Sequence, residues 1–280
     1  MENQDTRRDS VSNKLESITV SKIKTYLNCP AVYFFRYVRG FKTPSRSYQM
    51  LGTAVHAAIA QNYRSKKSTR EDMPLAEIKE FYSATFDYQR DHVLWERNEN
   101  PGKFKDEGAK LLALYHTTIA PQIMPELVES PVQFKIDGAD IIFKGVIDLV
   151  TDTGLIVDHK VSSRTPVPDA VRQDLQGSGY AFAYYHLKNR LADGMFFDYI
   201  LRGRSQSIIR VEAHKTFDDI NHFLSLLILV VDSIRKWRFY PSATNPYCSP
   251  RLCPFWDKCK NGKSFDWEFP VNEPDSPVPF

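Results

Sequence analysis

The segment GVIDLVTDTGLIVDHK, residues 145–160, constrains the fold of this chain more than any other stretch. Two β-rich runs flank the turn-forming residues 152–154, a pattern typical of a β-hairpin. The first run carries Asp148, and the second carries Asp158 followed by Lys160. Charges are costly inside an apolar core unless a partner compensates them. The sequence therefore predicts a cation at this hairpin.

The hairpin also predicts which ion would bind. Facing positions of a hairpin lie side by side, so Asp148 and Asp158 can approach each other across the ladder. Neighbouring carboxylates repel unless a cation is present, and hard oxygen ligands favour Mg²⁺, Mn²⁺ or Ca²⁺. Side chains alternate along a strand, so Lys160 shares a face with Asp158 and would orient water or offset charge on a phosphate. A simple salt bridge between Asp148 and Lys160 is the alternative interpretation.

The rest of the pattern predicts an α/β fold. Helical periodicity runs from residue 20 to about residue 124, with a break near the stretch NENPGK. Further runs follow, as strands at 131–136, 140–150, 154–160, 195–203 and 207–215, and as helices at 168–189 and 217–237. This order indicates a small mixed β-sheet flanked by helices, with an N-terminal helical subdomain.

The domain organisation is expected to be simple. Disordered tails are predicted for residues 1–17 and 263–280, and a single domain for residues 18–262. That domain would comprise a helical part over 18–125, a sheet core over 130–240 and a cysteine-rich segment over 248–259. The chain of 280 residues, 42% of them hydrophobic, is long enough for one large domain.

Charge and hydropathy bear on partners and location. The net charge of +3 is small, but seven lysines and arginines face only Glu16 between residues 11 and 50. Such a run can dock a phosphate backbone, although a solvated surface is the commoner role for any one lysine. No apolar segment follows the N-terminus, and the longest apolar run, 223–231, is too short to span a bilayer. We expect a soluble cytoplasmic protein, bacterial or phage-encoded, with no membrane partner.

Four cysteines suggest a second metal site. Cys29 stands alone, whereas Cys248, Cys253 and Cys259 lie within twelve residues. In a reducing compartment such a set is more typical of metal ligands than of disulfides. Four thiolates can hold either a structural zinc ion or an iron–sulfur cluster.

Five elements, in order, resemble the PD-(D/E)XK nucleases and, within them, the RecB-like exonucleases, including the CRISPR-associated iron–sulfur members. GTAVH resembles the Gly-X-X-His-type motif, GVID the strand that presents the first acid, and DHK the (D/E)-X-K element. QGSGY resembles the Gln-X-X-X-Tyr motif, and the layout of one cysteine before the core and three after it is the fifth element. The first gap in the cysteine trio is four residues here instead of the family's usual two, and the second gap of five matches.

The resemblance implies a restriction-endonuclease-like fold and a Mg²⁺- or Mn²⁺-dependent deoxyribonuclease, expected to be an exonuclease. It implies catalytic roles for five residues: Asp148, Asp158, Lys160, Gln176 and Tyr180. It implies that the metal ligands are His56, Asp148, Asp158 and the backbone carbonyl of His159.

The same resemblance implies a [4Fe–4S] cluster on Cys29, Cys248, Cys253 and Cys259 that ties the chain ends together, with Zn²⁺ as the alternative. The expected partner is DNA with a single-stranded end, contacted by Arg36, Arg39 and Arg172. Recombination, repair and CRISPR-adaptation proteins are candidate partners. The alternatives are a catalytically inactive DNA-binding subunit and a zinc-stapled endonuclease.

Two smaller features complete the sequence-based interpretation. Gly177 and Gly179 each cost a helix about 1 kcal/mol relative to alanine, which suggests a close approach by a DNA backbone or by the sheet. The stretch NGKS at 261–264 ends like a phosphate-binding loop, but Asp257 stands where the leading glycine should be. No ATP site is expected.

Overall fold

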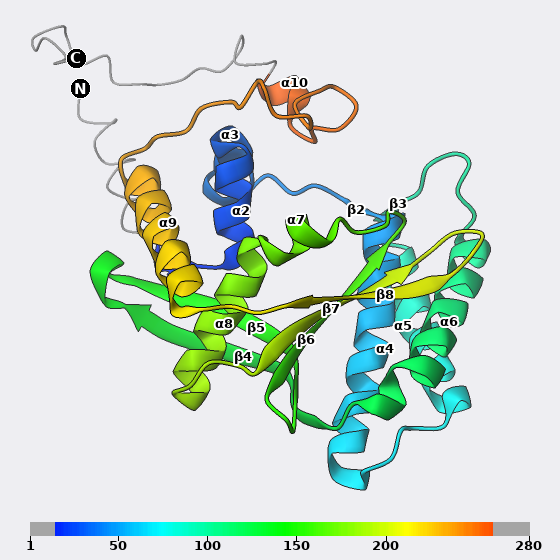
Figure 1. Ribbon diagram of the computed structural model, residues 1–280. Coiled ribbons are helices and arrows are strands. Elements are labelled where there is room, and N and C mark those ends of the chain that lie inside the picture. Colours follow the sequence, from blue (N-terminus) through cyan, green and yellow to red (C-terminus); the bar gives the residue numbers. More distant parts are fainter. Residues whose placement is uncertain (1–14, 260–280) are drawn as a thin grey trace, which may run out of the picture.

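A mixed sheet of six strands lies between two layers of helices in the computed structural model, which describes residues 15–259 (Figure 1). The strands follow the order β1-β5-β6-β7-β8, and β4 pairs with β5. Their bounds are β1 Ser17–Ile18, β4 Pro125–Ile136, β5 Ile141–Thr151, β6 Leu155–Ser162, β7 Gly194–Leu201 and β8 Ser207–Ala213. The predicted α/β class, with a mixed sheet flanked by helices, is confirmed.

One edge of β5 is shared by two different strands. β4 pairs antiparallel along nearly all of β5, so β1 and β6 both lie on the opposite edge. β1 pairs parallel with residues 142–143, and β6 pairs antiparallel with residues 149–150. The edge of β5 between these two pairings opens, and Asp148 lies at this opening. Ser17, which the sequence assigned to the N-terminal tail, is part of β1.

β4 begins six residues before the predicted start at Pro131. The sequence pattern placed the change from helix to strand at Pro131, because the hydrophobic period changes there. β4 pairs only with β5 and is an edge strand, where a missing backbone N–H is tolerated. The strand therefore also contains Glu129, which matters for the site.

One face of the sheet is covered by three long helices, α4 (Ser47–Thr69), α5 (Leu75–Arg90) and α6 (Pro101–Thr118). Ala54 and Ala58 on α4 are fully buried against Leu149 and Val157 of the sheet. These small side chains allow the helix backbone to approach the strands. A two-stranded ribbon of β2 (Ser45–Arg46) and β3 (Val93–Leu94) joins the ends of this layer.

The opposite face is covered by α2 (Val20–Asn28), α8 (Leu175–Lys188) and α9 (Phe217–Arg235). The predicted helix 168–189 is two helices, because α7 (Pro168–Arg172) ends before Asp174 caps α8. A Cβ atom on Gly177 would lie 2.9 Å from Lys215 Cε and 3.3 Å from Met195 Sδ, and one on Gly179 would lie 2.4 Å from Val20 Cγ2. Protein atoms therefore account for the close approach at both glycines.

Residues 30–38 and 240–259, far apart in the sequence, lie side by side above this second layer (Figure 1). The N–H of Ala31, in α3 (Pro30–Tyr33), donates to the carbonyl of Tyr240. The short π-helix η1 (Phe34–Val38) follows α3, and Phe35 packs against Phe255 beside α10 (Trp256–Cys259). This contact joins residues separated by more than two hundred positions.

Residues 1–14 and 260–280 are outside the described part of the chain, so most of the predicted N-terminal tail, the C-terminal tail and the stretch NGKS are not covered. Within residues 15–259, no helix has both the length and the apolar character needed to cross a membrane.

Candidate active site

Three carboxylates lie in a row on three neighbouring strands. The β4–β5 register pairs Val128 with Leu149 and Ser130 with Ile147, which places Glu129 opposite Asp148. The β5–β6 register pairs Leu149 with Val157, so Asp158 is one step beyond the last pair and adjacent to Asp148. The sheet thus brings Asp148 and Asp158 to the opening in the edge of β5, with Glu129 beside Asp148 on the opposite edge.

Helix α8 joins the second and third carboxylates. Tyr180 Oη lies 3.1 Å from Asp148 Oδ1 and 3.0 Å from Asp158 Oδ1. Gln176 Nε2, one helical turn away on the same face, donates to Asp158 Oδ1 at 2.8 Å and to Tyr180 Oη at 2.9 Å. Gly177 and Gly179 lie between these two residues and let the helix approach the sheet this closely.

Lys160 is held on the same side as Asp158. Its ammonium lies 2.7 Å from Asp158 Oδ2 and donates to Gln176 Oε1 at 2.8 Å. Asp148 instead pairs with His56, so the alternative of an Asp148–Lys160 salt bridge is wrong. All five residues that the resemblance implied as catalytic therefore form one hydrogen-bonded cluster.

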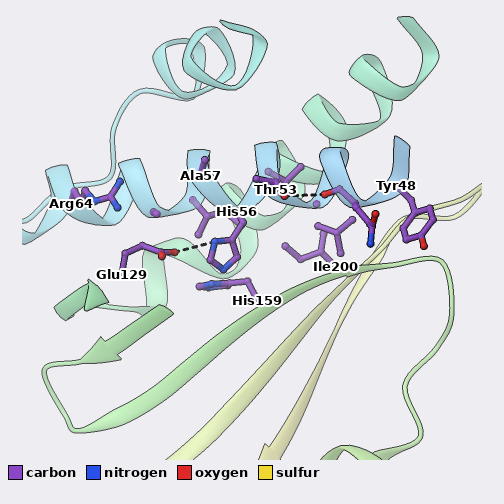
Figure 2. A pocket seen from close by; sticks show the side chains of 14 residues that line it. Tyr48, Thr53, His56, Ala57, Arg64, Glu129, His159 and Ile200 are labelled. Atoms are coloured by element: carbon purple, nitrogen blue, oxygen red, sulfur yellow. Dashed lines mark hydrogen bonds and ion pairs between the residues drawn. The ribbon is translucent and has the colours of Figure 1, made fainter. Parts of the chain in front are cut away.

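His56 reaches the cluster from α4, on the other face of the sheet. Its Nε2 atom lies 2.8 Å from Asp148 Oδ2, and its Nδ1 atom lies 3.0 Å from Glu129 Oε1. Figure 2 shows the imidazole between Glu129 and His159, with α4 running above it. A histidine bonded to two carboxylates in this way is fixed in both position and orientation.

These contacts shift the ionisation of the site. Burial lowers the pKa of His56, but hydrogen bonds to Asp148 and Glu129 outweigh it and raise that pKa to about 10. Burial raises the pKa of Asp158 to about 6, with Lys160 opposing and the Asp148 charge adding to the shift. The pKa of Lys160 is raised although burial lowers it, because the Asp158 carboxylate favours the ammonium form. The cluster without a metal ion therefore holds extra positive charge beside its carboxylates.

The His159 side chain was not expected to take part, because the resemblance implied only its backbone carbonyl. The ring is buried, and its Nε2 atom lies 2.7 Å from the hydroxyl of Tyr115. Burial, followed by the charge of His56, lowers the pKa of His159 to about 4. The imidazole is therefore neutral at pH 7.

The donor set fits a divalent metal ion. Asp158 Oδ2 is buried, and the Lys160 ammonium lies 2.7 Å away from it. His56, Asp148 and His159 each offer a ligand atom within 4.8 Å of the others. One carboxylate and two imidazoles this close together form a donor set that can bind a divalent metal ion.

A cavity of about 650 Å³ opens beside this donor set, between α4 and the sheet (Figure 2). His56, Glu129 and His159 form its inner wall. Tyr48 and Arg64 lie at opposite ends of the wall that α4 contributes, sixteen residues apart and hence about 24 Å along the helix. The cavity is thus long enough for an extended polymer to reach His56 and Glu129, whereas Asp148 and Asp158 are not among the residues that line it.

The three arginines predicted to contact nucleic acid do not line this cavity. Arg36 lies over the ring of Phe255 and lines a different cavity, near the cysteines. Arg39 is exposed at the end of η1. Arg172 on α7 is bound to Asp169 and to the carbonyl of Glu212. Their contact with DNA stays a prediction.

The four cysteines meet although one is more than two hundred residues from the others. Cys29, Cys248, Cys253 and Cys259 all line one cavity of about 230 Å³. The N–H of Ser242 donates to Cys29 Sγ at 3.4 Å. Burial raises the pKa of the Cys253 thiol, and the other three cysteines add to this effect. No three of their sulfur atoms lie within 4.8 Å of one another in the described residues, but thiols that line one cavity would be stabilised as thiolates by a bound metal or cluster.

Two residues of the site were missed by the sequence interpretation. Glu129 was excluded because the strand was started at Pro131, and its backbone adopts an unusual positive φ of 46°. Tyr115 is in α6 with the spacing of an ordinary core residue, and nothing in the sequence connects it to His159.

Fold and site together define a class. The site has the core of a nuclease with a restriction-endonuclease-like fold. Adjacent strands carry two acids and a lysine, α4 contributes a histidine, and α8 carries the Gln-X-X-X-Tyr motif. The family model of the PD-(D/E)XK nuclease superfamily matches residues 17–260. The chain therefore belongs to that superfamily, with a RecB-like arrangement of motifs.

Solved structures agree on the fold. A protein from Eubacterium rectale, solved as a candidate exonuclease, has a TM-score of 0.60 over 94% of this chain and 93% of its own, with 12% sequence identity. A second protein, SSO0001, covers 86% of this chain and 89% of its own at 11% identity, but its TM-score of 0.36 carries no argument. No curated protein matches the chain.

Proposed function

We propose that this protein is a metal-dependent DNA exonuclease that hydrolyses phosphodiester bonds. The observation that carries the proposal is the complete cluster of Asp148, Asp158, Lys160, Gln176 and Tyr180, joined by hydrogen bonds and closed by His56. An inactive DNA-binding subunit would be expected to have lost an acid or the lysine. The preference for DNA ends is supported by the fold shared with the candidate exonuclease from Eubacterium rectale.

His56, Asp148, Asp158 and the carbonyl of His159 are proposed to hold Mg²⁺ or Mn²⁺. Such an ion, when bound, acts as a Lewis acid and lowers the pKa of a coordinated water. Glu129 accepts the Nδ1 proton of His56, so Nε2 is the nitrogen that faces the metal position. A carboxylate behind a ligating histidine fixes the ring and raises its basicity.

Lys160 is proposed to act on the substrate. Its ammonium stays charged, because Asp158 raises its pKa, and it lies within hydrogen-bonding distance of the carboxylate that faces the metal. From there it can orient the attacking water and offset negative charge that develops on the phosphate. Gln176 holds the ammonium, and the Tyr180 hydroxyl holds both carboxylates in place.

The cavity along α4 is proposed to receive a single strand that ends at the carboxylates. Tyr48 at one end is 53% exposed and offers a ring on which a base can stack. Arg64 at the other end is exposed and can contact a phosphate. A role in recombination, repair or CRISPR adaptation remains a prediction.

The four cysteines are proposed to hold a [4Fe–4S] cluster, with Zn²⁺ as the alternative. Their meeting in one cavity and the N–H bond to Cys29 Sγ support a bound thiolate. A cluster would give broad visible absorption after anaerobic purification, whereas zinc would leave the protein colourless. Metal analysis of the same sample would decide between the two.

Degradation of end-labelled DNA tests the enzyme directly. The anaerobically purified protein is incubated with single- and double-stranded DNA, together with Mg²⁺, Mn²⁺ or a chelator. We expect metal-dependent shortening from an end, abolished in Asp158→Ala and Lys160→Ala, whereas Lys188→Ala, outside the site, should retain activity. Circularised DNA distinguishes an exonuclease from an endonuclease. Binding of DNA without cleavage under every metal would instead identify an inactive subunit.

A further inference from the structure

The His159 side chain faces the donor set rather than solvent. His56, Asp148 and His159 each contribute one nitrogen or oxygen, and these three atoms lie within 4.8 Å of one another. Among residues 15–259, no other histidine, cysteine, aspartate or glutamate group of three or more meets that condition. The centroids of the His56 and His159 rings are 5.6 Å apart, and the rings meet edge to face at 73°.

Each of the two rings has a fixed partner behind it. Glu129 Oε1 lies 3.0 Å from His56 Nδ1, and the Tyr115 hydroxyl lies 2.7 Å from His159 Nε2. A second tyrosine, Tyr63, lies 2.9 Å from the Tyr115 hydroxyl and continues the chain of hydrogen bonds. Histidines that ligate metals almost always donate their other N–H to such a partner. When Nε2 carries the proton and donates it to the Tyr115 hydroxyl, the unprotonated Nδ1 is the nitrogen left for a metal.

Two buried tyrosines pack against the His159 ring, which also borders the cavity. Tyr63 stacks on it at 6.2 Å, and Tyr115 meets it edge-on at 5.1 Å. Both tyrosines are fully buried. Asp198, its register partner on β7, is also fully buried and is bound at both oxygens by Arg210, at 2.7 and 2.8 Å. The orientation of the imidazole is therefore set by the fold before any ion binds.

From these contacts we infer that the His159 imidazole is itself a metal ligand, so this centre binds a first-row transition ion such as Mn²⁺ in preference to Mg²⁺. Mg²⁺ favours oxygen donors and retains water, whereas imidazole suits the transition metals. A donor set of two imidazoles and a carboxylate therefore favours a transition metal over Mg²⁺. Tyr115 is a positioning residue that acts through His159. The inference depends on the proposed function only for the presence of a divalent ion.

Pulsed EPR of bound Mn²⁺ counts the nitrogen ligands without reference to cleavage. The full-length protein, purified anaerobically so that the cysteine site is occupied, is titrated with Mn²⁺ and examined by electron spin echo modulation. We expect ¹⁴N couplings from two imidazoles in the parent and from one in His159→Ala. Modulation that is identical in the two proteins would overturn the inference and leave the backbone carbonyl as the only ligand at this position.

Metal selectivity gives a second readout. Competition with Mg²⁺ should show that His159→Ala loses about tenfold or more of the preference for Mn²⁺, and that Tyr115→Phe binds Mn²⁺ about tenfold more weakly. If His159→Ala keeps the parent's preference for Mn²⁺, His159 is not a ligand. If Tyr115→Phe binds Mn²⁺ as tightly as the parent does, Tyr115 does not position His159. His222→Ala, an exposed histidine on α9, is the matched control. His159→Gln replaces His159→Ala if the alanine variant does not fold.

Failure of the inference is distinguishable from failure of the proposed function. If the parent degrades DNA but His159→Ala binds Mn²⁺ as the parent does, the nuclease stands and the ligand assignment falls. If two nitrogens are seen on Mn²⁺ but no DNA is cleaved, the metal centre stands and the nuclease falls. Lys160→Ala should retain both nitrogen couplings and lose cleavage, since the lysine is not a ligand.

Discussion

At the scale of single residues, the site depends on charges that satisfy one another. Asp148 is the shared residue, because it bonds to His56 on one side of the sheet and to Tyr180 on the other. Its pKa is lowered although burial raises it, since the hydrogen bond and charge of His56 favour the carboxylate. The buried carboxyl group of Asp148 is thus held ionised at the position where a cation would bind.

Glu129 should act through His56. Glu129→Ala removes the acceptor of the Nδ1 proton, and we expect metal affinity to fall by about 10–100-fold. Glu129→Gln keeps an acceptor oxygen and should lose less. Isothermal titration with Mn²⁺ measures both variants, and Glu126→Ala on the same strand, whose partner is Lys188, is the control. An alanine variant with the affinity of the parent would remove Glu129 from the site.

At the scale of elements, α8 must hold Gln176 and Tyr180 at a fixed height above the sheet. Asp174 caps this helix by accepting the N–H of Gln176 at 2.8 Å, and both of its oxygens accept from Lys24 of α2. Burial raises the pKa of Asp174, but the Lys24 ammonium and the cap bond outweigh it, so that the pKa is lowered. One carboxylate thus fixes the start of α8 and ties it to α2.

The lowered pKa of Asp174 predicts a pH-dependent contribution to stability. The carboxylate stabilises the folded state above its unfolded pKa, near 4, and this contribution is lost as the pH falls through the lower folded value. We expect Asp174→Ala to cost about 1–2 kcal/mol at pH 7, and Asp174→Asn, which keeps a cap, less than about 1 kcal/mol. Urea unfolding at pH 7 and at pH 3 measures the free energy of unfolding of the parent and of both variants. A difference between parent and Asp174→Asn that persists unchanged at low pH would contradict it.

The approach of α8 to α2 depends on Gly179. A Cβ atom there would meet Val20 Cγ2 at 2.4 Å, so Gly179→Ala should destabilise the fold by about 1–3 kcal/mol despite the better helix propensity of alanine. In a Val20→Ala background the clash disappears, and the same substitution should become neutral or stabilising. Thermal unfolding of the four proteins forms a double-mutant cycle. Additive effects would show that Val20 is not the obstacle.

At the scale of the whole molecule, the cysteine cavity joins the two ends of the chain. Cys29 precedes strands β4 to β8, and the other three cysteines follow them, so a metal or cluster held by all four would close a loop around most of the nuclease core. The energy of metal binding then becomes folding energy. The bound group is therefore expected to act on stability rather than on the chemistry at Asp148.

Removal of one cysteine ligand should open the loop that the bound metal or cluster closes. We expect Cys29→Ser to lose the bound metal or cluster and to lower the melting temperature by about 5–10 °C. Differential scanning calorimetry of anaerobic protein, with iron and zinc analysis of the same sample, measures both effects. A variant that melts like the parent and holds the same metal content would show that Cys29 is not a ligand.

Much of the carboxylate cluster was predictable, because its spacing is local. Asp148 and Asp158 face each other across one short turn, Lys160 shares the face of Asp158, and Gln176 and Tyr180 are one helical turn apart. Those relations follow from the periods of a strand and of a helix. Sequence patterns did not predict the residues that distant segments bring to the site. Glu129 is an example, because the strand was predicted to start at Pro131, two residues later.

The sequence by itself therefore determined the α/β class, the hairpin with its acids and lysine, and the motifs that mark a nuclease. The tertiary structure alone decided that β1 and β6 share an edge of β5, that Glu129 bonds to His56 Nδ1, and that the Tyr115 hydroxyl lies 2.7 Å from His159 Nε2. The physical reason is that local periodicity fixes which face a side chain occupies. Only packing between distant segments fixes which partner it meets there.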